Sequence, residues 1–155
     1  MHILNSEKMK KIITENANET KKIAGELAKD FLNGGIIALS GELGAGKTTF
    51  AQGFAGGLGV KAKIISPTFL IIRQYPIPGR KNFFYHIDLY RLEDIDPDRI
   101  GVDFKNSGLE EILSDPSNVV LIEWAEKITK DLPINTKKIE FKISGELHQI
   151  SFTNF

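Results

Sequence analysis

The stretch Gly41-Glu42-Leu43-Gly44-Ala45-Gly46-Lys47-Thr48 constrains the fold of this chain more than any other part of the sequence. It matches the phosphate-binding loop pattern G-x-x-x-x-G-K-[ST] at every fixed position. The glycines of such a loop adopt backbone angles that side chains forbid, so successive N–H groups can turn inward around phosphate oxygens. The lysine brings a mobile positive charge to the β- and γ-phosphates, and the last hydroxyl can replace one water on Mg²⁺.

The residues on either side of the loop are those that a strand and a helix require. Ile36-Ile37-Ala38-Leu39 is an unbroken apolar run, which is typical of a parallel strand covered on both faces. Phe50 and Phe54 repeat at helical spacing, and the glycine-rich residues 56–59 should end that helix. The positive N-terminal end of the helix would face the same anion as the loop. The sequence therefore predicts an α/β nucleotide-binding domain.

Two acidic residues at strand ends are candidates for the chemistry. In Val119-Val120-Leu121-Ile122-Glu123 four apolar residues precede an acid, the form of a Walker B strand that places a carboxylate beside Mg²⁺ and the attacking water. The run His86-Ile87-Asp88-Leu89-Tyr90-Arg91 ends a second strand, in which period-two geometry puts His86 and Asp88 on one face. Considered without the loop, Asp88 and Arg91 would be a structural ion pair. Trp124 is expected to pack in the core or beside adenine.

A kink at Ser66-Pro67-Thr68 interrupts an extended stretch from Lys61 to Tyr75. Proline removes a backbone donor, so the chain must break its sheet pairing there or lie at an edge. The two hydroxyls could sense the γ-phosphate, with Thr68 as the preferred contact, and the alternative is an ordinary turn hydroxyl.

The remaining elements are predicted from caps, turns and alternation. A strand at 11–14 precedes a helix that Asn16 caps, with Glu19 as its capping-box partner. Turn residues at 76–80 predict a hairpin. The polar segment 93–118 is expected to be loop apart from a short helix at 109–113, and it offers a partner surface. Alternating apolar residues from Ile139 onward predict a closing hairpin.

Composition excludes several classes of protein. A length of 155 residues is expected to make a single domain, 1–155. The 20 Lys and Arg balance 20 Asp and Glu, so nothing indicates an extended nucleic-acid-binding surface. No apolar run reaches the length of a membrane span, and there is no cysteine for disulfides. A soluble cytoplasmic protein is the expectation.

A phosphate-binding loop leaves three classes of function open. The first is an ATPase that drives or resets a partner protein. The second is a small-molecule or nucleoside kinase, but the arginines that its lid would need are scattered at Arg73, Arg80, Arg91 and Arg99. The third is a guanine-nucleotide switch, for which Asp98-Arg99-Ile100-Gly101 superficially fits D-x-x-G, although no N-K-x-D motif exists.

Taken together, these motifs resemble the TsaE (YjeE) family. Four stretches carry the resemblance, in this order: Gly41-Glu42-Leu43-Gly44-Ala45-Gly46-Lys47-Thr48-Thr49, Ser66-Pro67-Thr68-Phe69, His86-Ile87-Asp88-Leu89-Tyr90-Arg91 and Ile122-Glu123-Trp124. The family comprises small bacterial ATPases of the pathway that installs threonylcarbamoyl on adenosine 37 of tRNAs reading codons that begin with A. The similarity runs from about Asn16 to Trp124.

The resemblance implies a three-layer P-loop NTPase-like fold with a mixed, mainly parallel sheet and antiparallel hairpins. It also implies the TsaB and TsaD proteins as partners, where ATP binding and hydrolysis to ADP would support multiple turnover. Direct contact with tRNA stays open. The segment between Arg91 and Ile122 is longer than is usual in the family. Glu146 stands near a position where relatives often carry a basic residue, so no nucleotide contact is assigned there.

The resemblance also implies roles for individual residues. Lys47 would hold phosphates, Thr48 and Glu123 would ligate Mg²⁺, and Asp88 would be the second acid. Either Glu123 or Asp88 would orient the attacking water. Ser66 and Thr68 would form a nucleotide-responsive switch. The residues implied in ATP binding are Asn16, Thr20, Glu42, Leu43, Gly44, Ala45, Gly46, Lys47, Thr48 and Thr49.

Overall fold

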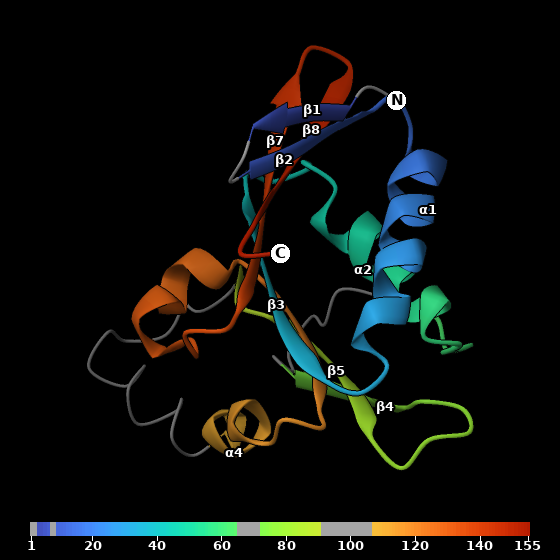
Figure 1. The fold of residues 1–155 in the computed structure, drawn as a ribbon, viewed down its shortest axis with the longest axis vertical. Coiled ribbons are helices and arrows are strands. Elements are labelled where there is room, and N and C mark those ends of the chain that lie inside the picture. The colour runs from blue at the N-terminus through green and yellow to red at the C-terminus, as the bar shows by residue number, and fades with distance from the viewer. Residues whose placement is uncertain (1–2, 7–8, 65–71, 91–106) are drawn as a thin grey trace.

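The computed structural model describes residues 3–6, 9–64, 72–90 and 107–155 (Figure 1). Ser66, Thr68, Arg91 and the segment 93–106 therefore lie outside the described residues. Along the chain the elements are β1 (Ile3–Ser6), β2 (Met9–Thr14), α1 (Ala17–Ala28), η1 (Lys29–Phe31), β3 (Gly35–Gly41), α2 (Lys47–Gly57), β4 (Ile72–Pro76), β5 (Phe83–Asp88), α4 (Leu109–Ser114), β6 (Val119–Glu123), η3 (Ala125–Asp131), β7 (Lys137–Ser144) and β8 (Leu147–Thr153).

The described strands form one eight-stranded sheet in the order β1-β2-β8-β7-β3-β6-β5-β4. Its four central strands, β7, β3, β6 and β5, run parallel. Antiparallel pairs extend the sheet on both sides, with β4 beside β5 and the order β7-β8-β2-β1 at the other edge. The predicted mixed sheet, parallel in its core and with antiparallel hairpins, is confirmed.

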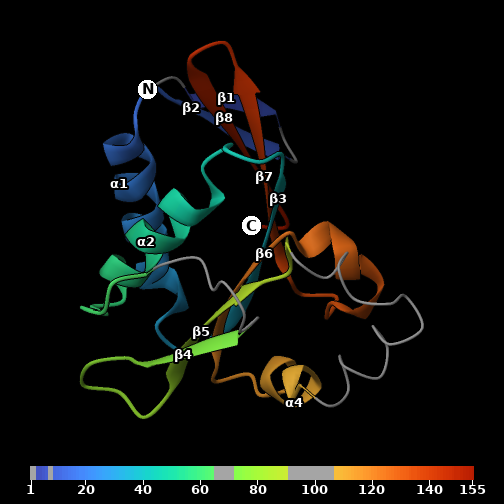
Figure 2. The same cartoon turned by 180° about the vertical axis from the view of Figure 1, so that it is seen from behind.

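Helices cover both faces of this sheet. Helices α1 and α2 pack on one face, and α4 and η3 on the other (Figures 1 and 2). Alternate residues of β3 supply the two cores: Ile37 and Leu39 join the α1/α2 side with Phe50 of α2, while Ala38 joins the α4/η3 side. The predicted three-layer arrangement is confirmed, and a strand buried on both faces explains the unbroken apolar runs.

The start of α1 matches the predicted cap with one difference. Asn16 Oδ1 accepts a hydrogen bond from the backbone N–H of Glu19 at 3.0 Å. The Glu19 carboxylate accepts in return from the N–H of Glu15 at 2.9 Å, one residue earlier than a capping box has it. One backbone donor that the helix leaves unpaired, that of Glu19, and the N–H of the residue before the cap are satisfied in this way.

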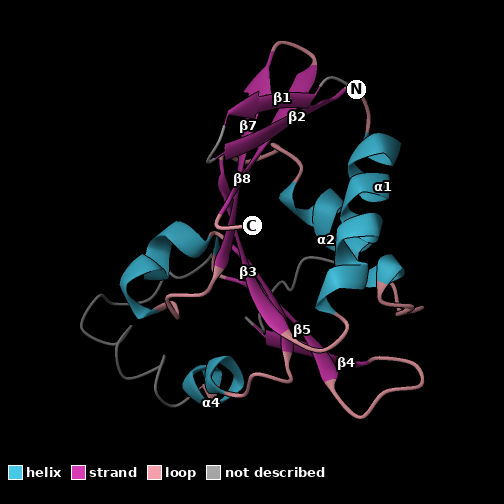
Figure 3. Cartoon of the chain, in the orientation of Figure 1, coloured by secondary structure: helices cyan, strands magenta, loops and turns pink. Residues whose placement is uncertain are grey.

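The short helix predicted at 109–113 is confirmed as α4, and the two predicted hairpins are β4–β5 and β7–β8. Two elements were not predicted: β1, which pairs with β2, and η3, which follows β6 directly (Figure 3). None of the helices in the described ranges is long and apolar enough to cross a membrane.

Candidate nucleotide and metal site

The phosphate-binding loop connects the carboxyl end of β3 to the first residue of α2, as the sequence predicts. Gly41, Gly44 and Gly46 all have positive φ, at 135°, 79° and 106°. Gly41 faces a second restriction, because a Cβ there would lie 2.3 Å from the carbonyl oxygen of Phe141 in β7. Strand β7 therefore lies so close to the first residue of the loop that only glycine fits at position 41.

Lys47 lies folded over the loop and is only 5% exposed. Its ammonium donates to the carbonyl oxygens of Gly41 and Glu42, at 2.5 and 2.7 Å. Its Nζ also lies 4.0 Å from the centroid of the Trp124 ring, in cation–π distance. An ammonium has three N–H donors, so one is left for a ligand that enters the loop.

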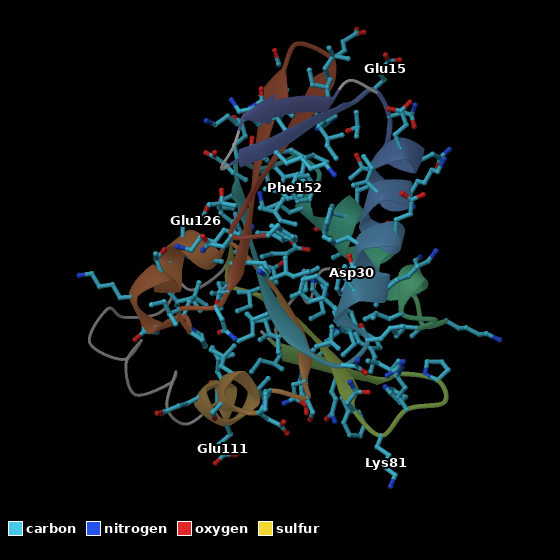
Figure 4. The ribbon with its side chains drawn as sticks, viewed as in Figure 1. Glu15, Asp30, Lys81, Glu111, Glu126 and Phe152 are labelled. Carbon is cyan, nitrogen blue, oxygen red and sulfur yellow. The ribbon has the colours of Figure 1, made fainter. Side chains whose placement is uncertain are left out.

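The electrostatic surroundings of Lys47 act in two directions. Burial lowers the pKa of the Lys47 ammonium from its usual value, because desolvation penalises the charged form. The carboxylates of Glu123, Glu126, Asp88 and Glu42 act in the opposite direction. Glu126 is an exposed residue in the first turn of η3 (Figure 4). Acidic groups from the loop and from three other elements thus surround the lysine.

Glu123 is the buried centre of the site, 2% exposed at the last residue of β6. Thr48 Oγ1 donates to Glu123 Oε2 at 3.0 Å. His86 Nε2 lies 3.0 Å from Glu123 Oε1. The hydroxyl of the loop and the acid of the Walker B strand, 75 residues apart in the sequence, are therefore in direct contact.

Asp88 ends β5, and its Cα is paired in register with that of Glu123. The two acids therefore terminate neighbouring parallel strands at the same edge of the sheet, where α/β proteins bind their ligands. Asp88 Oδ1 accepts the backbone N–H of Tyr90 at 2.9 Å, which closes a turn at the strand end. The structure thus brings Lys47, Thr48, Asp88 and Glu123 to one place.

Residues 14–150 match the model of the family described as "Threonylcarbamoyl adenosine biosynthesis protein TsaE". The chain belongs to the TsaE family. A TsaE protein of Bacillus subtilis is 40% identical over 144 residues, 90% of this chain and 82% of the relative. One of Treponema pallidum is 32% identical over 134 residues, 86% of this chain and 92% of the relative. The crystal structure of Bacillus subtilis YdiB has a TM-score of 0.70 at 34% identity, covering 97% of this chain and 88% of that one.

The family match extends past Trp124, where the motif resemblance ended, into β8. The C-terminal hairpin of this TsaE-family chain indeed contacts the loop. The backbone N–H of Ile143 donates to Glu42 Oε1 at 3.4 Å, and His148 Nδ1 lies 3.0 Å from the carbonyl oxygen of Ala45. Because a carbonyl only accepts, Nδ1 is the donor. Sequence reasoning missed His148, and no motif marks it.

Trp124 packs against the buried cluster on the α4/η3 face, which confirms the core packing predicted for it. Its backbone is left-handed, at φ 59° and ψ 37°, which is unusual for a residue with a side chain. The ring covers Lys47 and packs against Tyr90, with ring centroids 5.1 Å apart. Lys127 Nζ donates to the Tyr90 carbonyl oxygen at 2.7 Å, which links η3 to the residue that packs against Trp124. Strained backbone of this kind is found where a side chain must be held in place.

The other residues implied in ATP binding have varied positions. Leu43 is 70% exposed at the tip of the loop. Thr49 follows Thr48 in the first turn of α2. The side chain of Asn16 caps α1, and Thr20 is buried with its Oγ1 2.9 Å from that of Thr14. In the structure Asn16 therefore caps α1, and Thr20 links the first turn of α1 to the end of β2.

The donor chemistry of the site fits Mg²⁺. The Thr48 hydroxyl and the Glu123 carboxylate are hard oxygen donors, and Mg²⁺ commonly takes one or two protein oxygens together with waters and phosphate oxygens. Within the described ranges, no three His, Cys, Asp or Glu side chains gather into a metal site by themselves. Nucleotide and water would therefore have to supply most of the ligands.

Proposed function

We propose that this chain is a Mg²⁺-dependent ATPase that acts in forming threonylcarbamoyladenosine at position 37 of tRNA, by binding and resetting a TsaB–TsaD complex. Membership of the TsaE family supports the role in threonylcarbamoyladenosine biosynthesis. The observation that carries the ATPase activity is the Thr48–Glu123 hydrogen bond at 3.0 Å beside the Lys47 ammonium. This hydrogen bond joins the phosphate-binding loop to the acid at the end of β6, the two parts from which P-loop nucleotide sites are built.

In this proposal the loop binds the β- and γ-phosphates of ATP through its backbone N–H groups and the remaining N–H of Lys47. Thr48 and Glu123 hold Mg²⁺, which when bound neutralises charge on the phosphate oxygens. Lys47 stabilises the negative charge that develops as the γ-phosphoryl group is attacked in line by water. The Trp124 ring limits the freedom of the Lys47 side chain and shields it from solvent.

Asp88 is the better of the two candidates for orienting the attacking water. Both oxygens of Glu123 already have partners, Thr48 on one and His86 on the other. Asp88 lies beside Glu123 in register at the strand ends. Because the Thr48 hydroxyl that we propose for Mg²⁺ contacts Glu123, we assign Glu123 to the metal and the neighbouring Asp88 to the water.

We expect slow hydrolysis by the chain alone, and among the described residues no arginine contact with the loop is seen. Arg80 donates instead to the carbonyl oxygen of Leu32 and to Asn33 Oδ1, at 3.1 and 3.0 Å. Efficient phosphoryl transfer to water usually needs an arginine that stabilises the transition state. A partner protein that supplies or organises such a group would accelerate the reaction.

The test is steady-state ATP hydrolysis by the chain alone and with purified TsaB and TsaD of the same organism. We expect a low rate that the partners stimulate, and no stimulation for Lys47→Ala. An unchanged rate together with no complex would contradict the proposal. Transfer of the γ-phosphate to a member of a nucleoside panel would support a kinase instead.

A further inference from the structure

The buried imidazole of His86 has no role in the mechanism above. His86 is 0% exposed in β5, and its Nε2 lies 3.0 Å from Glu123 Oε1. A buried polar ring destabilises the fold unless hydrogen bonds compensate for its lost hydration. The Glu123 carboxylate is the contact that compensates here.

The second ring nitrogen of His86 has different surroundings from Nε2. Its Nδ1 is buried and has no hydrogen-bond partner within the described part of the chain. Buried nitrogens of this kind are rare in folded proteins and call for an explanation. Among the described residues, the hydrogen bond of the ring is with Glu123, the acid of the site.

We propose that His86 is a positioning residue that fixes the Glu123 carboxylate for Mg²⁺, an inference that rests on the proposed function. An ionised carboxylate only accepts, so Nε2 donates to Oε1. Thr48 holds the other oxygen, Oε2, from the opposite side at 3.0 Å. The last torsion of a glutamate is broad, and two donors on different oxygens restrict it to one orientation.

This arrangement places His86 in the second layer around the metal. A ligating carboxylate that is itself hydrogen-bonded presents its free lone pairs in a fixed direction. Loss of such an outer partner typically weakens metal affinity by about tenfold to a hundredfold. The parallel register of β5 and β6 explains the contact between His86 and Glu123. Asp88 is paired with Glu123, and His86, two residues before Asp88 in the same strand, lies on the same face of the sheet.

Four variants separate positioning from packing. His86→Leu removes the donor at similar volume. His86→Gln keeps an amide donor near the place of Nε2, whereas His86→Asn carries its amide near the place of Nδ1. Ile87→Ala is the matched control, because Ile87 is also fully buried in β5 but belongs to the core of the opposite face.

The measurement is calorimetric affinity for a non-hydrolysable ATP analogue, once with Mg²⁺ and once with EDTA, after thermal unfolding has shown that each variant is folded. We expect the ratio of the two affinities to fall about tenfold or more in His86→Leu and His86→Asn. His86→Gln should restore most of it, and Ile87→Ala should lower stability but keep the ratio.

If the ratio of the affinities with Mg²⁺ and with EDTA is unchanged in His86→Leu, the inference is wrong. If His86→Leu does not fold, equal ratios in His86→Gln and His86→Asn would overturn the inference instead. A wild-type chain with no Mg²⁺-dependent difference would instead overturn the proposed function, and the inference with it.

Discussion

At the scale of single residues, the two acids of the site differ although their strands pair them side by side. Glu123 contacts the hydroxyl of Thr48 and the ring of His86, and Asp88 accepts, among its contacts, the backbone N–H of Tyr90 in its own turn. Equal positions in the sheet thus have unequal surroundings. In the proposed function, Glu123 would hold the metal and Asp88 would orient the water.

Asp88→Asn should separate binding from hydrolysis. The amide is isosteric and can still accept from Tyr90, so affinity for Mg²⁺-ATP should be retained. It is a poor base, and single-turnover hydrolysis should slow by about a hundredfold. The measurements are calorimetric binding and single-turnover phosphate release.

Asp30→Asn is the matched control, since Asp30 is an exposed acid of η1 (Figure 4). It should leave both quantities unchanged. If Asp88→Asn lost affinity as strongly as it lost rate, Asp88 would have a metal or folding role instead.

The sequence predicted the residues of the loop and the two acids, but not the contacts that hold them. The motif spacing indicates Lys47, Thr48 and Glu123 because phosphate and Mg²⁺ require those groups. The Trp124 ring over Lys47 and the His148 bond to Ala45 depend on tertiary structure, across 77 and 103 residues of sequence. No local pattern encodes such contacts.

At the scale of elements, α1 and α2 approach each other so closely that only glycine fits at their crossing. A Cβ at Gly53 would lie 2.4 Å from the Lys21 carbonyl oxygen, and one at Gly57 would lie 2.3 Å from that of Gly25. Because α2 begins at Lys47, this crossing also sets the position of the phosphate-binding loop.

Gly53→Ala should destabilise the fold by about 1–3 kcal/mol, because the added methyl group forces the two helices apart. Gly56→Ala, in the same helix, meets nothing within 4 Å. It should stabilise the protein by up to about 1 kcal/mol through helix propensity. Chemical denaturation measures both, and equal effects of the two substitutions would contradict the close crossing.

The two elements that the sequence did not predict have weak local signals. Strand β1 is only four residues long and exists through its pairing with β2. Segment η3 begins after the left-handed Trp124 and is interrupted at Ile128, where φ is −127°. Short 3₁₀ turns of this kind lack the apolar repeat that marks an α-helix.

At the scale of the whole molecule, sheet order assembles the site. Strand β6 lies between β3 and β5, so the loop after β3 and the acids that end β6 and β5 meet at one edge. On its other side β3 pairs with β7, which places the C-terminal hairpin against the loop. The α/β class could be predicted from the loop and the apolar runs, and the mixed sheet from the family resemblance. The strand order could not be predicted, because it depends on long crossovers.

The most direct test of the site is calorimetric titration of wild type and Lys47→Ala with Mg²⁺-ATP. In the proposed function Lys47 supplies the charge that faces the phosphates, so wild type should bind tightly and Lys47→Ala should not. Lys81→Ala removes an exposed lysine (Figure 4) and should bind as wild type does. Unchanged affinity in Lys47→Ala would contradict the assignment of this site.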